Sequence, residues 1–182
     1  HNTLTSNVVG TRITAVGTGA MITNTASDNV AVGYNSLATC STGSNNTSIG
    51  TEAMDACTTG SANVAVGYRT LDALTTASNN TCVGQAAGGA ITTGANNTIV
   101  GKAAGSSLTT GGNCILIGKE ANVSGSNNDE LVIGNSISGI GNNTGLIYPP
   151  GGGSMYQATN ATTWAQTSDR RIKKNIVDNN KG

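Results

Sequence analysis

The chain has 182 residues, of which 26 are glycine, 36% are hydrophobic and only 10% are charged. Nine basic and nine acidic residues cancel, so the chain lacks the basic footprint of a nucleic-acid-binding protein, and no run of about 18 apolar residues predicts a membrane-spanning helix. Because the chain begins with His1 rather than Met, we expect it to be a piece of a longer protein.

A repeat with a short period organises most of the chain. Residues 1–27 are interpreted as a cap or degenerate first coil with its strand at 11–17, and residues 28–134 as a regular shaft. Each unit closes on a glycine, and five steps of 17 residues followed by one of 16 separate these glycines. They are Gly33, Gly50, Gly67, Gly84, Gly101, Gly118 and Gly134. Such a period predicts a repeat architecture in which each unit is one coil.

Each glycine follows a three- or four-residue strand that ends in a β-branched residue. These residues are Val32, Ile49, Val66, Val83, Val100, Ile117 and Ile133. Since the side chains of a strand alternate between two faces, we expect this structural ladder and the residues two positions earlier to face the core. Position 65 would then face outward, so Val66→Asp is expected to destabilise the shaft far more than Ala65→Asp.

The segments after each glycine predict the rest of the coil. A second inward row is expected from large or apolar residues four and seven positions on, and Thr, Gly, Ser and Asn supply the turns. That second row comprises Leu37, Met54 and Leu71, together with Cys40, Cys57, Leu74, Ile91 and Leu108. The sequence therefore predicts an all-β protein, a parallel β-solenoid or β-roll of about eight 17-residue coils. Because its core would be thin, we expect several chains to associate side by side.

Two coils depart from this pattern, and the cysteines need separate treatment. Segments 85–89 and 102–105 carry Ala and Gly where other coils are bulky, so the solenoid is expected to narrow there or to admit another chain. Cys40 and Cys57 occupy equivalent places in adjacent coils, which favours packing as small hydrophobic residues but leaves a disulfide open. Cys82 and Cys114 lie in strand segments, and no spacing predicts a metal site or a cofactor.

The repeat stops after Gly134. Residues 135–167 are interpreted as an irregular connector with a Pro/Gly hinge at 148–153, which cannot continue a hydrogen-bonded ladder. Residues 168–182 form a final segment in which the charge density rises.

Two stretches resemble known families. The repeats, for example 33–50, resemble those of phage tail fibres and are similar to the head repeats of trimeric bacterial autotransporter adhesins, which are trimeric β-rolls. The string from Trp164 to Ile176 (WAQTSDRRIKKNI) resembles the start of the endosialidase-type intramolecular chaperone found at the end of many tail fibres. In that family the chaperone trimerises, folds the fibre that precedes it and then cuts itself off.

The second resemblance implies a self-cleavage site. The cut would fall between Thr167 and Ser168, with Ser168 as the nucleophile and Lys173 as its base. Only 15 residues follow that bond, too few for the chaperone domain, so we expect 168–182 to be the truncated start of that domain and the bond to stay intact here.

The combined interpretation is the structural and host-adhesion segment of a trimeric viral tail fibre, extracellular and part of the virion. Its expected partners are two further copies of itself and a host surface receptor, a glycan or an outer-membrane component, with neither nucleic acid nor membrane insertion. Tyr34 and Tyr68 would pack in the trimer or stack on sugars. The alternative is a bacterial adhesin head, which a membrane-anchor barrel downstream would support. An enzyme limited to self-cleavage is a further alternative. An ice-binding solenoid is weaker, because Thr47, Thr81 and Thr98 share the expected inward orientation.

Overall fold

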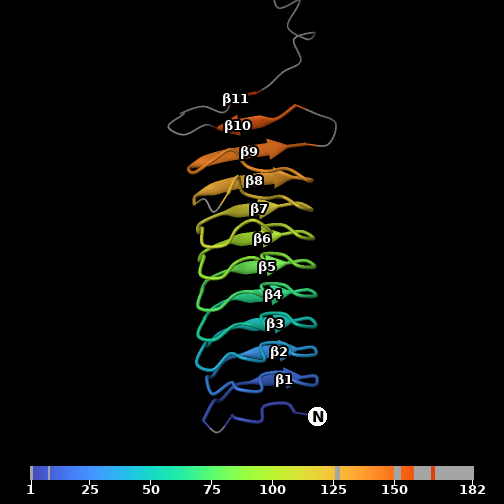
Figure 1. The fold of residues 1–182 in the computed structure, drawn as a ribbon, viewed down its shortest axis with the longest axis vertical. Coiled ribbons are helices and arrows are strands. Elements are labelled where there is room, and N and C mark those ends of the chain that lie inside the picture. Colours follow the sequence, from blue (N-terminus) through green and yellow to red (C-terminus); the bar gives the residue numbers. More distant parts are fainter. Residues whose placement is uncertain (1, 8, 126–127, 150–152, 158–164, 167–182) are drawn as a thin grey trace, which may run out of the picture.

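The computed structural model confirms the predicted fold class, an all-β parallel solenoid whose coils stack in sequence order (Figure 1). It describes residues 2–7, 9–125, 128–149, 153–157 and 165–166. The strands are β1 (Thr14–Val16), β2 (Val30–Val32), β3 (Thr47–Ile49), β4 (Val64–Val66), β5 (Thr81–Val83), β6 (Thr98–Val100), β7 (Ile115–Ile117), β8 (Glu130–Gly134), β9 (Thr144–Tyr148), β10 (Met155–Gln157) and β11 (Ala165–Gln166).

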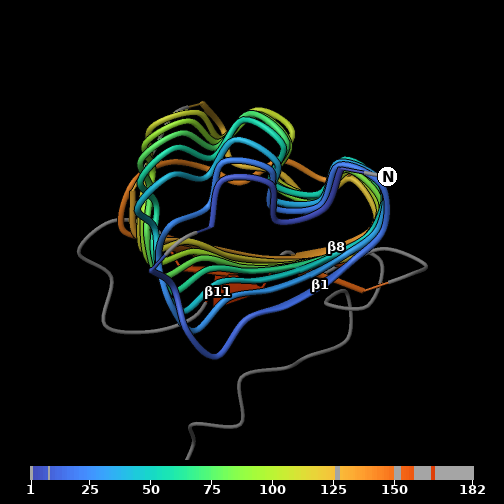
Figure 2. The same cartoon turned by 90° about the horizontal axis from the view of Figure 1, so that it is seen from below.

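The coils stack without any shift in register. Strands β1 to β9 pair in parallel, so that Val32 lies beside Ile49 and Ile49 beside Val66. The sheet forms one side of the solenoid, and the segments that follow each strand return on the other (Figure 2). Hydrogen bonds also join these return segments, as between the Leu71 N–H and the Ala87 carbonyl at 3.1 Å. Backbone hydrogen bonds therefore hold both sides of every coil to the next.

The sheet continues past the last repeat. β9 pairs in parallel with β8, where Glu130 lies beside Thr144, and β10 and β11 then extend the same sheet in antiparallel order. The expected connector at 135–167 thus contributes strands to the sheet. Residues 150–152 of the expected hinge lie outside the described residues.

The orientation expected for the strand residues is wrong. The middle residue of each strand faces the core: Ala65 is 0% exposed, whereas Ile49 and Val100, at the position expected to face inward, are 39% and 38% exposed. The structural ladder therefore exists as a row of paired residues, but it lies on the outer face of the sheet. The strand centres can face inward because most are small, and the coil has little room between its two sides.

The second inward row, by contrast, is confirmed, since all eight of its residues are fully buried. The size of these residues and the size of the strand centre vary inversely from coil to coil, so that one is large where the other is small. In the fourth coil a small strand centre, Ala65, accompanies a large residue, Leu71, whereas two coils later a large strand centre, Ile99, accompanies Gly105. A Cβ atom added at Gly105 would lie 2.7 Å from Ile99 Cδ1, so these two positions fill the same space.

Because of this inverse relation, the core does not narrow at 85–89 and 102–105, where the sequence led us to expect a narrower solenoid or the approach of another chain. The side chains of Cys82 and Ile99 fill the space that Gly88 and Gly105 leave empty. Only the outer surface is lowered.

We expect a swap within the sixth coil to demonstrate this shared volume. Ile99→Ala alone should destabilise the chain by about 2–5 kcal/mol, and Gly105→Leu alone by about 1–3 kcal/mol through overpacking. The double variant copies the Ala65–Leu71 pair and should recover most of the loss in chemical denaturation. Strictly additive effects would contradict a shared space.

A column of buried asparagines runs beside the strands, at Asn29, Asn46, Asn63, Asn80 and Asn97. Asn63 Nδ2 donates to the Ala77 carbonyl at 2.9 Å, and Asn63 Oδ1 accepts from the Asn80 backbone N–H at 3.0 Å. Each side chain thus closes the turn of its own coil and satisfies a backbone donor of the next. The turn role expected of asparagine holds for the exposed neighbour Asn79, whose φ is 61°, whereas the column itself is part of the core.

The glycine that closes each strand is required by the close approach of the coils. Gly67 has a φ of 136°, and a Cβ atom there would lie 2.6 Å from the Gly84 carbonyl oxygen. Any larger residue would therefore strain the backbone and force two coils apart.

Candidate functional site

The most extensive surface feature is the outer side of the sheet. We call the two outward rows of β1–β8 the ladder face. Its first row is Thr14, Val30, Thr47, Val64, Thr81, Thr98, Ile115 and Leu131, and its second row is Val16 followed by the seven residues of the structural ladder. Because the strands pair without shift, both rows run straight along the solenoid.

The second row of the ladder face continues beyond the repeats. Ile133 lies beside Ile147 in β9, and Ile147 lies beside Met155 in β10, which is 43% exposed. The apolar row therefore crosses ten strands from Val16 to Met155. At about 4.8 Å per strand, it is some 45 Å long.

Neither row carries a charged side chain between β1 and β8. In the described part of the chain, more than half of the exposed large apolar side chains belong to these two rows or to their extension at Met155. Apart from threonine hydroxyls, such a surface carries only apolar groups. It can bind another surface through apolar contact and shape.

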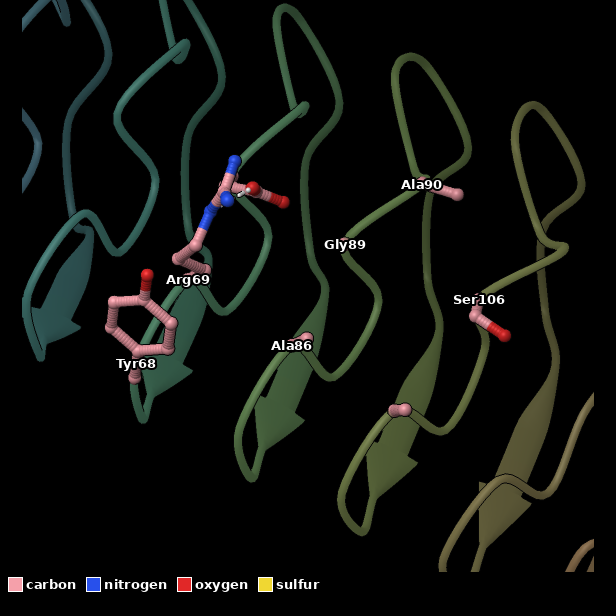
Figure 3. A pocket seen from close by; sticks show the side chains of 8 residues that line it. Tyr68, Arg69, Ala86, Gly89, Ala90 and Ser106 are labelled. Atoms are coloured by element: carbon pink, nitrogen blue, oxygen red, sulfur yellow. Dashed lines mark hydrogen bonds and ion pairs between the residues drawn. The ribbon is translucent and has the colours of Figure 1, made fainter.

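A second feature is a groove on the return segments of the fourth to sixth coils, which we call the corner groove (Figure 3). It is shallow and open to solvent, with a volume of about 500 Å³. Its lining consists of Tyr68, Arg69, Asp72, Ala86, Gly89, Ala90, Ala103 and Ser106. None of these residues belongs to the ladder face.

Charged residues gather at one end of the corner groove. Arg69 Nε lies 2.9 Å from Asp72 Oδ2 and 3.6 Å from Glu52 Oε2. The charge of Asp72, followed by its hydrogen bond, raises the pKa of Arg69. Partial burial and then the neighbouring carboxylates of Glu52 and Asp72 raise the pKa of Asp55. Arg69 therefore pairs with two carboxylates and lies near a third, that of Asp55, and of these only Asp72 lines the groove.

The four cysteines are buried and are thiols rather than disulfides. Cys40 Sγ and Cys57 Sγ lie 3.5 Å apart in adjacent coils, and burial raises the pKa of Cys82, which faces the core from the centre of β5. Cys114 stands in the asparagine column, where its N–H donates to Asn97 Oδ1. All four pack as small core residues, and burial keeps the Cys82 thiol neutral and unreactive.

The residues predicted for self-cleavage, Thr167, Ser168 and Lys173, lie outside the described residues. Tyr34 and Tyr68 lie in one row two coils apart and are about half exposed, at 51% and 48%. Within the described ranges, no three His, Cys, Asp or Glu side chains are grouped as metal ligands, and no helix could cross a membrane.

Sequence reasoning missed both surface features, since the ladder face was assigned to the core and the corner groove was seen only as small residues. No protein-family model matches the chain, and neither a curated protein nor a solved structure is significantly similar to it.

Proposed function

We propose that the chain is a shaft segment of a trimeric extracellular fibre, the structural and host-adhesion part of a viral tail fibre. The observation that carries this proposal is the uncovered ladder face. A straight, uncharged row of apolar side chains across ten strands, β-branched in all but the last, is larger than the scattered apolar residues that soluble monomers expose. A partner that covers this face removes that surface from water.

A further copy of the same chain fits this face best. Its rows repeat at the strand spacing, so an identical face with the same spacing can interdigitate with it over its whole length. Each strand presents two outward residues, and in a three-fold arrangement one row can contact each neighbour. Since these side chains are already half buried, each would contribute roughly 1 kcal/mol on association.

Sedimentation of the folded chain tests this proposal. We expect a mass three times the 18.0 kDa of one chain. Val66→Asp, in the middle of the ladder face, should yield a folded monomer, because three carboxylates cannot be buried together without partners. Thr76→Asp is the matched control, since this exposed turn residue follows in the same coil, and it should remain trimeric. A monomeric wild-type chain would refute the proposal.

Maturation by the intramolecular chaperone is the second part of the proposal, and it rests on the resemblance at 164–176. In a product extended through the complete chaperone, the Thr167–Ser168 bond should break without added protease. Intact mass should show the cut in the wild type and its absence in Ser168→Ala, while Lys173→Ala should slow it strongly. An extended Ser168→Ala protein that is still cut at the same bond would exclude Ser168 as the nucleophile.

Ice binding is a second candidate. Thr47, Thr81 and Thr98 face outward, so the objection based on their orientation does not hold. Val30, Val64, Ile115 and Leu131 nevertheless interrupt the threonine row. A monomer that shows thermal hysteresis in freezing assays would favour this candidate over the fibre.

A further inference from the structure

The corner groove arises because two consecutive coils lack surface side chains that their neighbours carry. The position of Arg69 is Ala86 in the fifth coil and Ala103 in the sixth, and the position of Asp72 is Gly89 and Ser106. The seventh coil restores a long side chain with Glu120 at the position of Arg69. The lowered surface is therefore bounded on both sides along the solenoid.

Neither backbone geometry nor core packing requires these small residues. Ala86 and Ala103 have a φ of 53°, the same as Arg69, so the backbone at this position tolerates a long side chain. The inverse relation of sizes in the core involves different positions, the strand centres and the glycines at 88 and 105. The groove is thus a property of the outer surface alone.

The lining combines three kinds of group within about 500 Å³. Tyr68 presents a half-exposed aromatic ring, and the methyl groups of Ala86 and Ala103 provide an apolar floor. The ion pair of Arg69 and Asp72 presents hydrogen-bond donors and acceptors at one end. The Ser106 hydroxyl lies two coils further along the solenoid (Figure 3).

We propose that the corner groove binds a neutral saccharide of two or three sugar units. The C–H face of one ring would lie on Tyr68 and the alanine methyl groups, and sugar hydroxyls would bind Arg69, Asp72 and Ser106. The volume matches that of small-ligand sites, which combine apolar walls with a few polar groups. This inference deepens the proposed host attachment by giving it a site.

The carboxylates at the Arg69 end of the groove disfavour acidic sugars there. Glu52, Asp55 and Asp72 outnumber Arg69, and Arg69 already pairs with two of these carboxylates. A sialic or uronic acid would meet net repulsion at this end, whereas a hydroxyl can both donate to Asp72 and accept from Arg69.

The test uses the whole chain and saturation-transfer NMR with maltotriose, triacetylchitotriose, fucosyllactose and the anionic sialyllactose. We expect at least one neutral probe to bind with a dissociation constant in the millimolar range. Tyr68→Ala should weaken that binding about tenfold, whereas Tyr34→Ala, in the same row but away from the groove, should leave it unchanged. Ala86→Arg, which repeats the Arg69 side chain one coil later, should block the groove.

The outcomes separate this inference from the fibre itself, since each sample is also sedimented. Binding of a neutral saccharide by a monomeric chain would support the saccharide site and refute the proposed trimer. Failure of all neutral probes, preference for sialyllactose, or binding that survives Ala86→Arg would overturn the saccharide site whatever the oligomeric state. A change of mass with Ala86→Arg would assign the groove to contact between chains instead.

Discussion

Ala65→Asp is expected to destabilise the solenoid by about 3–5 kcal/mol, enough to unfold it, because its carboxylate would be buried without a partner. Position 65 is the centre of β4, fully buried between the sheet and the return segments. Neighbouring strand centres offer no compensating charge, since Ser48 lies on one side and Cys82 on the other.

The matched variant is Val66→Asp, one residue along the same strand. This side chain lies on the ladder face and is half buried in the single chain, so its carboxylate can reach water. Far-UV circular dichroism should therefore show β structure for Val66→Asp and its loss for Ala65→Asp. Equal melting temperatures for the two variants would contradict the observed alternation of the strand.

Asn63→Ala is expected to cost about 2–5 kcal/mol, because it leaves two buried backbone groups without partners. The Ala77 carbonyl loses its donor, and the Asn80 N–H loses its acceptor. Asn80 Nδ2, which also donates to Asn63 Oδ1 at 3.2 Å, loses that bond as well. The column is therefore broken on both sides of the substitution.

Asn79→Ala provides the control for this prediction in chemical denaturation. Asn79 is exposed, and the equivalent residue of the preceding coil is Ala62, which has a similar φ of 57°. The substitution should change stability by less than about 0.5 kcal/mol. An Asn63→Ala protein as stable as Asn79→Ala would mean that water replaces the column.

The sequence predicts the coil length, the strand positions and the second inward row, because these depend only on spacing. The direction of the strand residues could not be predicted from spacing alone. Hydrophobicity favours Val66 over Ala65 for the core, but packing decides the reverse, since a coil this thin has no room for Val66 opposite Leu71. Comparing equivalent positions across the coils would have revealed the direction. Where the residue four positions after the glycine is large, the strand centre is small, and the large strand centre Ile99 accompanies Gly105.

The corner groove is harder to predict for a related reason. Small residues at 86, 89, 103 and 106 are consistent with a thinner coil, a close neighbour or a lowered surface. The packing of Ile99 into the space beside Gly105 excludes a thinner coil, and it can be seen only in the structure. The Arg69–Asp72 pair at its end joins positions three residues apart, which spacing in a solenoid does not by itself bring together.

In each coil the strand centre and the residue of the second inward row must match in size. This match limits how genes for such chains can recombine. A crossover within the turn segments, for example between 75–80 and 92–97, transfers whole coils and changes the length of the solenoid in steps of about 4.8 Å. A crossover between a strand and the return segment that follows it would instead separate the matched residues. A coil that combines Ala65 with Gly105 would contain a cavity, and a coil that combines Ile99 with Leu71 would be overpacked. Viable length variants should therefore have their breakpoints in the turns.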